Sequence, residues 1–219
     1  IKPVGPIYIK PVGPIGTNCY IISEEGGGCA MVDPGAQPEK LIGFLDAKGL
    51  KPEYILLTHG HYDHIGGVKA IAQKYGAKIV ISEQDAEQLT DRSKSLASAR
   101  FPAGEDPYLM EADLMLKDGD TVRTGGLEFT AILTPGHTKG DITYRCGGVL
   151  FTGDTLFAGD CGRCDLYGGS YQTMLKSLKK LAALPGDYRV LPGHGPESTL
   201  EQERRYNQYV RMSPDDLLY

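Results

Sequence analysis

Apolar residues in the first half of the chain fall into short runs separated by turn residues, a pattern that predicts strands alternating with helices. The glycines at 26–28 indicate a hairpin turn, and Ser82 followed by Asp85 resembles a capping box that opens a short helix. The predicted strands are residues 17–23, 29–33, 54–57 and 78–82, and the predicted helices are 38–48, 65–75 and a short one ending near residue 89.

The second half shows the same alternation after an irregular stretch at residues 91–112, which has two prolines and little periodicity. We expect this stretch to be a loop that borders a functional site. Ser170 is placed to cap a helix at 170–183, and Ser198 with Glu201 resembles a capping box for the last helix. Strands are predicted near 120–124, 127–134, 142–146, 149–153 and 188–191. Strand groups with helices in both halves favour two packed sheets with helices outside.

The N-terminus carries a repeat, because IKPVGPI occurs at residues 1–7 and again, letter for letter, at 9–15. Repeat architectures recur at longer periods and more than twice, so this repeat does not indicate one. We therefore interpret residues 1–8 as an added or duplicated leader segment. The prediction is a single domain over 9–212, followed by a tail at 213–219.

Composition argues against several classes of protein. The 219 residues carry a formal net charge of −5, which argues against a nucleic-acid partner. No apolar run reaches the roughly 20 residues that a membrane-spanning helix needs. The five cysteines, an odd number, favour reduced thiols and hence a cytoplasmic location. We expect a globular protein that acts on a small molecule.

Histidines gather in one short stretch, LLTHGHYDHIGG, directly after a predicted buried strand. His59, His61 and His64 are three of the five histidines in the chain, and Asp63 lies among them. In an extended segment, side chains two positions apart point to the same side, so His59 and His61 can face one point. Imidazole and carboxylate groups in such a cluster are typical ligands of zinc, iron or manganese.

The remaining histidines also follow predicted strands. His137 lies in TPGHTKGD, His194 lies in PGHG, and Asp154 ends the strand GGVLFTGD. Side chains at strand ends can converge on one edge of the sheets. With the first cluster they make seven candidate ligands, which are too many for one tetrahedral ion and suit two ions that share a bridge.

Four motifs, in this order, resemble the metallo-β-lactamase fold superfamily: THGHYDHIGG, TPGHTKGD, TGDTLFAGDCGR and LPGHG. Within it, the chain is similar to the compact bacterial type of glyoxalase II-like (hydroxyacylglutathione hydrolase-like) enzymes. The resemblance implies an αββα sandwich, two mixed β-sheets flanked by helices, with a binuclear site at one edge. It implies that one metal is held by His59, His61 and His137, the other by Asp63, His64 and His194, and that Asp154 bridges them.

The resemblance also implies an activity, in which a metal-bound hydroxide oriented by Asp63 attacks a carbonyl. The expected substrate is a thioester such as S-lactoylglutathione, and the expected cofactors are two divalent ions, zinc before iron or manganese. Asp154 disfavours a penicillin-type substrate, because the best-known lactam-cleaving relatives carry a cysteine there. Arg163 follows a Cys-Gly pair and matches a basic residue that would contact the carboxylate of the thiol carrier. Tyr167 is a second candidate for substrate binding.

Three alternatives stay open. The stretch GRCDLYGGS also resembles persulfide dioxygenases, which would hold one iron with His59, His137 and Asp154. A hydrolase of another ester or a lactone, and a binding module without turnover, share the same fold. We interpret Cys161 and Cys164 as two thiols near the mouth of the site rather than as a redox pair.

Overall fold

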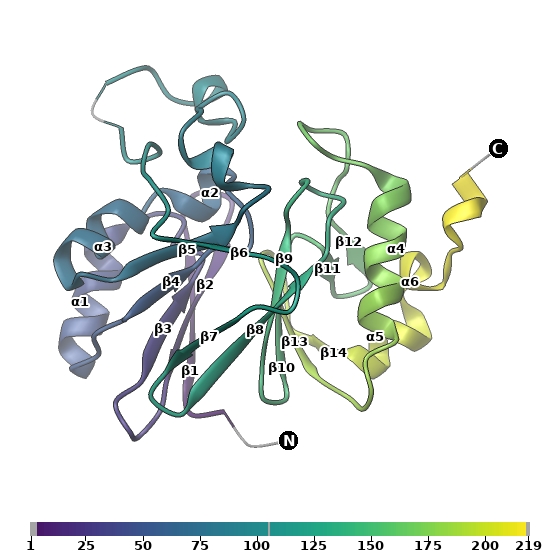
Figure 1. Cartoon of the computed structure of the whole chain (residues 1–219), viewed down its shortest axis with the longest axis horizontal. Helices are drawn as coiled ribbons and strands as arrows, with labels where there is room; N and C mark the ends of the chain where they lie inside the picture. Colours follow the sequence, from purple (N-terminus) through teal and green to yellow (C-terminus); the bar gives the residue numbers. More distant parts are fainter. Residues whose placement is uncertain (1–3, 105, 218–219) are drawn as a thin grey trace.

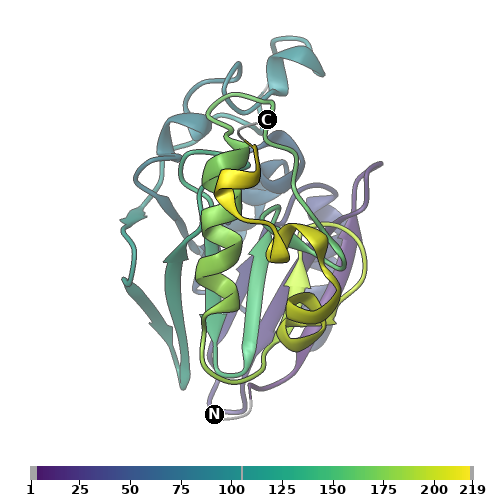
Figure 2. The same cartoon turned by 90° about the vertical axis from the view of Figure 1, so that its right-hand side faces the viewer.

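The computed structural model describes residues 4–104 and 106–217, and it contains two sheets packed face to face. Helices α1 and α3 cover the outer face of one sheet, and α4, α5 and α6 cover the outer face of the other (Figure 1). Turned by 90°, the molecule shows α4 lying along the second sheet (Figure 2). The predicted αββα sandwich is therefore confirmed.

The first sheet has six strands in chain order. The first three pair antiparallel, and the later ones pair parallel because helical connections carry the chain back across the sheet. Its strands are β1 Ile7–Val12, β2 Thr17–Ser23, β3 Cys29–Val32, β4 Tyr54–Leu56, β5 Lys78–Ser82 and β6 Leu114–Leu116. The helices of this half are α1 Pro38–Lys48, α2 Tyr62–Ile65 and α3 Val68–Tyr75, with short 3₁₀ helices η1 Ala86–Leu89 and η2 Ala97–Ala99.

The second sheet also has six strands, in the order β14-β13-β10-β9-β8-β7, and only β10 and β13 pair parallel. Its strands are β7 Thr121–Thr124, β8 Leu127–Leu133, β9 Ile142–Cys146, β10 Val149–Gly153, β13 Arg189–Pro192 and β14 Ser198–Thr199. A small ribbon and the outer helices complete this half: β11 Leu156–Phe157, β12 Asp160–Cys161, α4 Tyr171–Ala182, α5 Leu200–Tyr206, α6 Gln208–Arg211 and η3 Pro214–Leu217.

Three apolar clusters hold these layers together. One lies between the two sheets, one between the first sheet and α1 and α3, and one between the second sheet and its helices. Strand β2 is buried at every position because both of its faces are covered, whereas β7 alternates between exposed and buried positions. Burial on both faces explains why the middle of β2, residues 19–22, is a continuous apolar run.

Some sequence predictions of local structure are wrong. The last helix is capped by Thr199 with Gln202, one residue after the predicted pair, because strand β14 extends through Thr199 and the helix begins at Leu200. The predicted capping box is half formed: the backbone amide of Asp85 donates to the hydroxyl of Ser82 at 3.1 Å, but the carboxylate of Asp85 accepts from Thr138 and the helix that follows is 3₁₀.

Other differences concern where elements begin and end. The predicted helix at 65–75 is split after Ile65, where the backbone amide of Gly66 donates to Gly35 of a neighbouring loop. Strand β1 starts at Ile7, within the first copy of the repeat, and pairs with β2 as Ile7 with Ile22. The sheet thus begins two residues before the predicted domain start at residue 9. Within the described parts of the chain, every helix is too short or too polar to cross a bilayer.

Candidate metal centre

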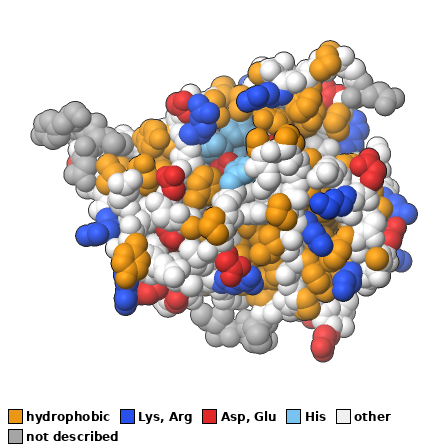
Figure 3. Space-filling model, turned by 180° about the vertical axis from the view of Figure 1, so that it is seen from behind, with side chains coloured by type: hydrophobic (Ala, Val, Ile, Leu, Met, Phe, Trp, Pro, Cys, Tyr) orange, Lys and Arg blue, Asp and Glu red, His pale blue; other side chains and the backbone are white. Residues whose placement is uncertain are grey.

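All seven predicted metal ligands lie at one end of the sandwich, just after strands β4, β8, β10 and β13. The chain leaves each strand there through a glycine-containing turn, so the side chains point into the space between the sheets. Histidine side chains are visible in a hollow of the surface on the face shown in Figure 3. The fold therefore brings together residues that are up to 135 positions apart, from His59 to His194.

One group of three histidines is almost completely buried. His59, His61 and His137 each offer a ring nitrogen, and these atoms lie within 4.8 Å of one another. Nε2 of His137 and Nδ1 of His61 are 2.9 Å apart. The three rings meet edge to face, with centroids 4.7 to 4.8 Å apart, so their nitrogens converge instead of stacking.

A second group of ligands lies beside the first and nearer the surface. It consists of Asp63, His64 and His194, again with ligand atoms within 4.8 Å. Oδ2 of Asp63 lies 3.3 Å from Nε2 of His64 and 3.1 Å from Nε2 of His194. Three ligand atoms from two loops thus converge on one point.

Asp154 lies between the two groups. Its Oδ1 is 3.4 Å from Nε2 of His64, and its Oδ2 is 3.5 Å from His137 and 3.4 Å from His194. One carboxylate therefore contacts members of both groups. This is the position that a bridging ligand requires.

Buried polar atoms without partners test whether this donor set suits a metal. Nε2 of His59 and of His64, and Oδ1 of Asp154, are buried and have no hydrogen bond among the described residues. Leaving such atoms unpaired is costly unless a cation accounts for them. Nitrogen and carboxylate donors in this arrangement fit zinc, iron or manganese.

Contacts behind the ligands fix their orientation. Nδ1 of His137 donates to the carbonyl oxygen of Arg163 at 2.6 Å, and Nδ1 of His64 lies 2.9 Å from Oδ2 of Asp33. These bonds turn Nε2 of each ring toward the centre. Asp33 is itself held by the backbone amide and the hydroxyl of Thr58.

Similar contacts support two more ligands. Nδ1 of His59 is 3.4 Å from a carboxylate oxygen of Asp141, and Oδ2 of Asp63 accepts a hydrogen bond from the hydroxyl of Thr17 at 3.0 Å. Burial, followed by the neighbouring His137, lowers the pKa of His61 to about 3. The ring is therefore neutral at physiological pH, as a metal ligand must be.

Two glycines of the motifs lie so close to Asp154 that a side chain would not fit at their positions. A Cβ on Gly193 would lie 2.3 Å from Oδ1 of Asp154, and a Cβ on Gly162 would lie 1.8 Å from the carbonyl oxygen of the same residue. No other residue fits at these positions without moving Asp154.

The sequence profile of the metallo-beta-lactamase superfamily matches residues 12–194, a span that includes all seven candidate ligands. The chain belongs to this superfamily. Its members are mostly hydrolytic enzymes.

Relatives in sequence cover nearly the whole chain. The Bacillus subtilis protein "Probable metallo-hydrolase YqgX" is 34% identical over 203 residues, which cover 91% of this chain and 95% of that protein. An uncharacterized protein of Mycobacterium tuberculosis, Rv2581c, is 37% identical over 216 residues, with the same coverage of 91% and 95%.

Solved structures of the superfamily are similar as well. BLEG-1, a B3 metallo-beta-lactamase, is 34% identical with a TM-score of 0.86, covering 94% of this chain and 100% of that one. TTHA1623 in a di-iron-bound form is 33% identical with a TM-score of 0.80, covering 92% and 99%. ETHE1 from Myxococcus xanthus is 26% identical with a TM-score of 0.80, covering 96% and 87%.

The metallo-β-lactamase centre of this chain opens into a pocket of about 500 Å³. His61, Asp63, His137, Asp154 and His194 all reach its wall. The loop at 91–112 also contributes to the wall, so the prediction that this loop borders the site is confirmed.

The two predicted substrate-binding residues lie differently from each other. Arg163 is part of the pocket wall, and its guanidinium makes two hydrogen bonds, of 2.7 and 2.8 Å, to the carboxylate of Asp165. Tyr167 lies outside the described wall; its hydroxyl donates to Glu87 at 2.9 Å and accepts from Lys139 at 3.1 Å. Tyr167 thus ties together three loops around the site.

Cys161 and Cys164 do not lie at the mouth of the site, so that interpretation is wrong. Both side chains are buried in the apolar cluster beneath α4. Burial raises the pKa of each thiol to about 12. The two residues between them, Gly162 and Arg163, line the pocket instead.

The sequence analysis missed the residues that support the ligands, among them Asp33 and Asp141. Each follows a recognisable signal: Asp33 ends a predicted strand before Pro34-Gly35, and Asp141 closes the motif TPGHTKGD. It also missed Arg100, in the loop at 91–112, whose side chain lines the pocket.

Proposed function

We propose that this chain is a metal-dependent hydrolase of a small thioester. The observation that carries the proposal is the convergence of seven candidate ligand side chains on one centre, five of which line an open pocket. Among the described residues, no serine, threonine or cysteine side chain lines that pocket. Water is therefore the nucleophile that the site can offer.

The candidate ligands form two groups, each of which can bind one ion. We propose that His59, His61 and His137 hold one divalent ion, that Asp63, His64 and His194 hold another, and that Asp154 contacts both. Bound there, the two ions would lower the pKa of a shared water and polarise the carbonyl of the substrate. Zinc, iron and manganese all suit these donors.

Asp63 has a second role in this proposal. Its carboxylate lies on the pocket wall and accepts a hydrogen bond from the hydroxyl of Thr17 at 3.0 Å. An ionised carboxylate at this place can accept a hydrogen bond from the attacking water and direct its lone pair toward the carbonyl.

The walls of the pocket favour an anionic thiol carrier such as glutathione. Arg100 and Arg163 both line it, and two cations suit carboxylates of the substrate. The volume of about 500 Å³ is in the range of small-molecule sites.

The decisive assay follows the loss of the thioester of S-lactoylglutathione with metal-replete protein. Turnover that stops with a chelator and returns with added metal supports the proposal. A His59→Ala variant should be inactive, and the matched control Met115→Ala, on the edge strand β6, should equal wild type. Hydrolysis that is insensitive to a chelator contradicts the proposal.

Two rival substrates are tested in the same experiment. BLEG-1 is a B3 metallo-beta-lactamase at 34% identity, which weakens the argument from Asp154 against a lactam substrate, so a chromogenic cephalosporin is assayed in parallel. The di-iron form of TTHA1623 favours testing iron-loaded protein for oxygen consumption with glutathione persulfide. Activity in that assay alone would favour the dioxygenase with His59, His137 and Asp154 as ligands.

We further propose that the protein works in a reducing compartment such as the cytoplasm. All five cysteines are free and buried. Titration of the unfolded protein with a thiol reagent, without reductant, should detect five free thiols per chain.

A further inference from the structure

A second hollow adjoins the metal pocket, and its walls are apolar. It has a volume of about 530 Å³ and lies between the hairpin turn after β1 and the loop at 91–112. We call it the apolar groove and define it by Ile15, Ala36, Tyr62, Phe101 and Tyr108.

The groove is continuous with the metal pocket. Ile15, Tyr62 and the ligand Asp63 belong to the walls of both. A substrate whose carbonyl lies at the metal centre could therefore extend one arm into the groove without crossing a barrier of protein.

Large apolar side chains are exposed where the groove opens. Ile15 is 53% exposed and Phe101 is 38% exposed. Apolar surface of this kind, next to a polar reaction centre, is typical of a ligand-binding site. An apolar group placed between the two residues would remove this surface from water, which is favourable.

The walls are held in place before any ligand arrives. Gly13 and Gly16 have φ angles of 72° and 66°, which form the tight turn that presents Ile15. The turn is closed by a bond from the amide of Gly16 to the carbonyl of Gly13, and the amide of Gly13 donates to Gln37. Such a turn stays rigid, so binding costs little ordering entropy.

The opposite wall is a set of packed aromatic rings. Phe101 and Tyr108 stack with centroids 4.8 Å apart and an interplanar angle of 22°, and Tyr62 meets Phe101 edge to face at 5.6 Å. These contacts fix a flat apolar surface toward the groove.

Charge separates the two hollows. Arg100 and Arg163 line the metal pocket, and no described carboxylate pairs with Arg100. Among the described residues that line the groove, Asp63 alone is charged. An anionic arm of the substrate is therefore favoured in the metal pocket and an apolar arm in the groove.

We propose that the groove binds the acyl arm of the substrate and that this arm is an alkyl or aryl group rather than a short polar one. The inference rests on the proposed hydrolase function, because it assigns the group on the acyl side of the bond that is cleaved. It makes apolar acyl thioesters better substrates than S-lactoylglutathione.

The first test uses acetyl, lactoyl, butanoyl and hexanoyl thioesters of glutathione with metal-loaded protein. Each methylene that becomes buried should raise kcat/KM by up to about fourfold. The hexanoyl thioester should therefore exceed the acetyl thioester by at least about tenfold.

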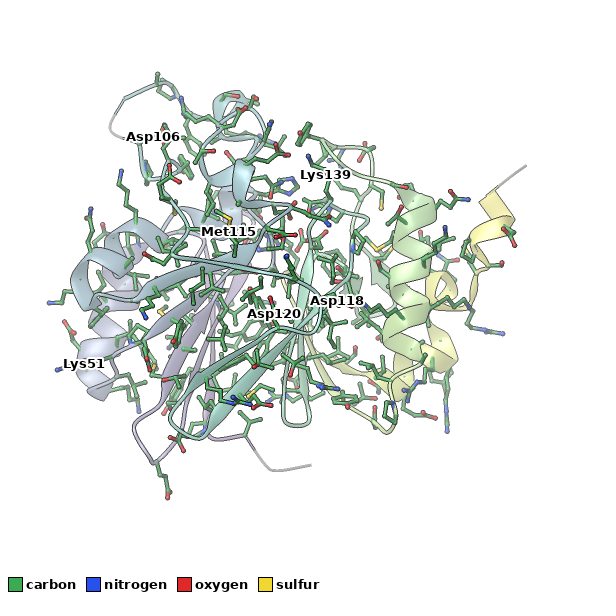
Figure 4. All side chains as sticks on the ribbon, viewed as in Figure 1. Lys51, Asp106, Met115, Asp118, Asp120 and Lys139 are labelled. Carbon is green, nitrogen blue, oxygen red and sulfur yellow. The ribbon has the colours of Figure 1, made fainter. Side chains whose placement is uncertain are left out.

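Two variants locate the effect. Ile15→Ser at the tip of the turn and Phe101→Ala should each lower the ratio of kcat/KM for the hexanoyl thioester to that for the acetyl thioester by at least about threefold. Ile15 lies on an exposed turn, so its replacement keeps the test valid if Phe101→Ala loosens the loop. The control is Met115→Ala, which is 54% exposed on β6 and lies outside both hollows (Figure 4).

Binding of product-like carboxylates gives a readout that does not need turnover. Hexanoate should bind the metal-loaded protein at least about tenfold more tightly than acetate, and Ile15→Ser should reduce this ratio. Equal binding of the two, or binding of neither, overturns the assignment of the groove.

The two proposals fail in different ways. Thioester hydrolysis at a rate independent of chain length leaves the hydrolase in place and overturns the groove. Tighter binding of hexanoate without hydrolysis of any thioester leaves the groove in place as a site for apolar chains and overturns the thioesterase.

Discussion

The two groups of metal ligands share one centre but differ in how the fold encloses them. The side chains of His59, His61 and His137 are nearly inaccessible to solvent. In the second group His194 is 25% exposed and Asp63 is 13% exposed, although His64 is fully buried. Both groups reach the pocket, through His61 and His137 in one and through Asp63 and His194 in the other, but the second group is more exposed to solvent. We call the first the closed group and the second the open group.

The less exposed group also has more supporting contacts behind its ligands. In the closed group, Nδ1 of His137 donates to the carbonyl of Arg163, and His59 lies beside Thr58 and Asp141. In the open group, His64 is supported by Asp33, but no hydrogen bond from Nδ1 of His194 is found in the described structure. From this difference we expect the closed group to retain an ion more firmly and the open group to exchange its ion more readily.

The largest expected effect comes from removing the residue that the two groups share. Asp154→Ala deletes a carboxylate that lies within 3.5 Å of His64, His137 and His194. Activity should fall by at least about a thousandfold, since both groups lose a ligand at once. Steady-state rates with saturating metal measure this. Glu25→Ala, an exposed acid in a hairpin turn, is the control, and a loss below tenfold in Asp154→Ala would contradict a bridging role.

Single ligands from each group sharpen the comparison. We expect His194→Ala to retain about one ion per chain after dialysis and His59→Ala to retain less than one, because only the closed group holds its ion firmly. Metal analysis of the dialysed variants decides this. Equal loss in both variants would show that the difference in enclosure does not govern affinity.

A smaller effect is expected from the residues behind the ligands. Asp33→Asn should weaken metal binding at the open group, and Asp141→Asn at the closed group, each by about 10 to 100-fold. Both carboxylates are buried, so thermal unfolding is recorded to separate a loss of stability from a loss of affinity. If both variants bind metal with the same affinity as wild type, these two residues do not support the metal ligands.

The smallest effects concern the arginines of the pocket. Arg163 already pairs with Asp165, whereas no described acid pairs with Arg100. Arg100→Ala should therefore raise KM for a glutathione thioester by up to about fivefold, and Arg163→Ala by less. A larger rise in KM for Arg163→Ala than for Arg100→Ala would show that Arg163 is the main contact for the thiol carrier.

Much of the fold could be predicted from local patterns. Strands such as 17–23 and 78–82 are short apolar runs bounded by turn residues, and the structure has them at the same positions. Strand β6 was missed because Leu114–Leu116 is short and its first two residues are largely exposed at the sheet edge. The cap lies at Thr199, one residue later than predicted, because strand β14 runs through both Ser198 and Thr199 before the helix begins at Leu200.

In the metal centre too, some residues could be predicted from local motifs and others could not. The seven ligands could be found because each lies in a short motif at a strand end. The support from Asp33 to His64 joins residues 31 positions apart, and the hydrogen bond from Tyr167 to Glu87 joins residues 80 apart. Which side chains meet over such separations depends on how the sheets pack, and local sequence does not contain that information.

The central claim is that two ions act together in one hydrolytic centre. The most direct measurement titrates metal-free protein with zinc, iron(II) or manganese and follows both bound metal and hydrolysis of S-lactoylglutathione. We predict that the rate keeps rising until two equivalents are bound and then stays constant. Full activity at one equivalent, or a rate that does not depend on metal, would contradict the account.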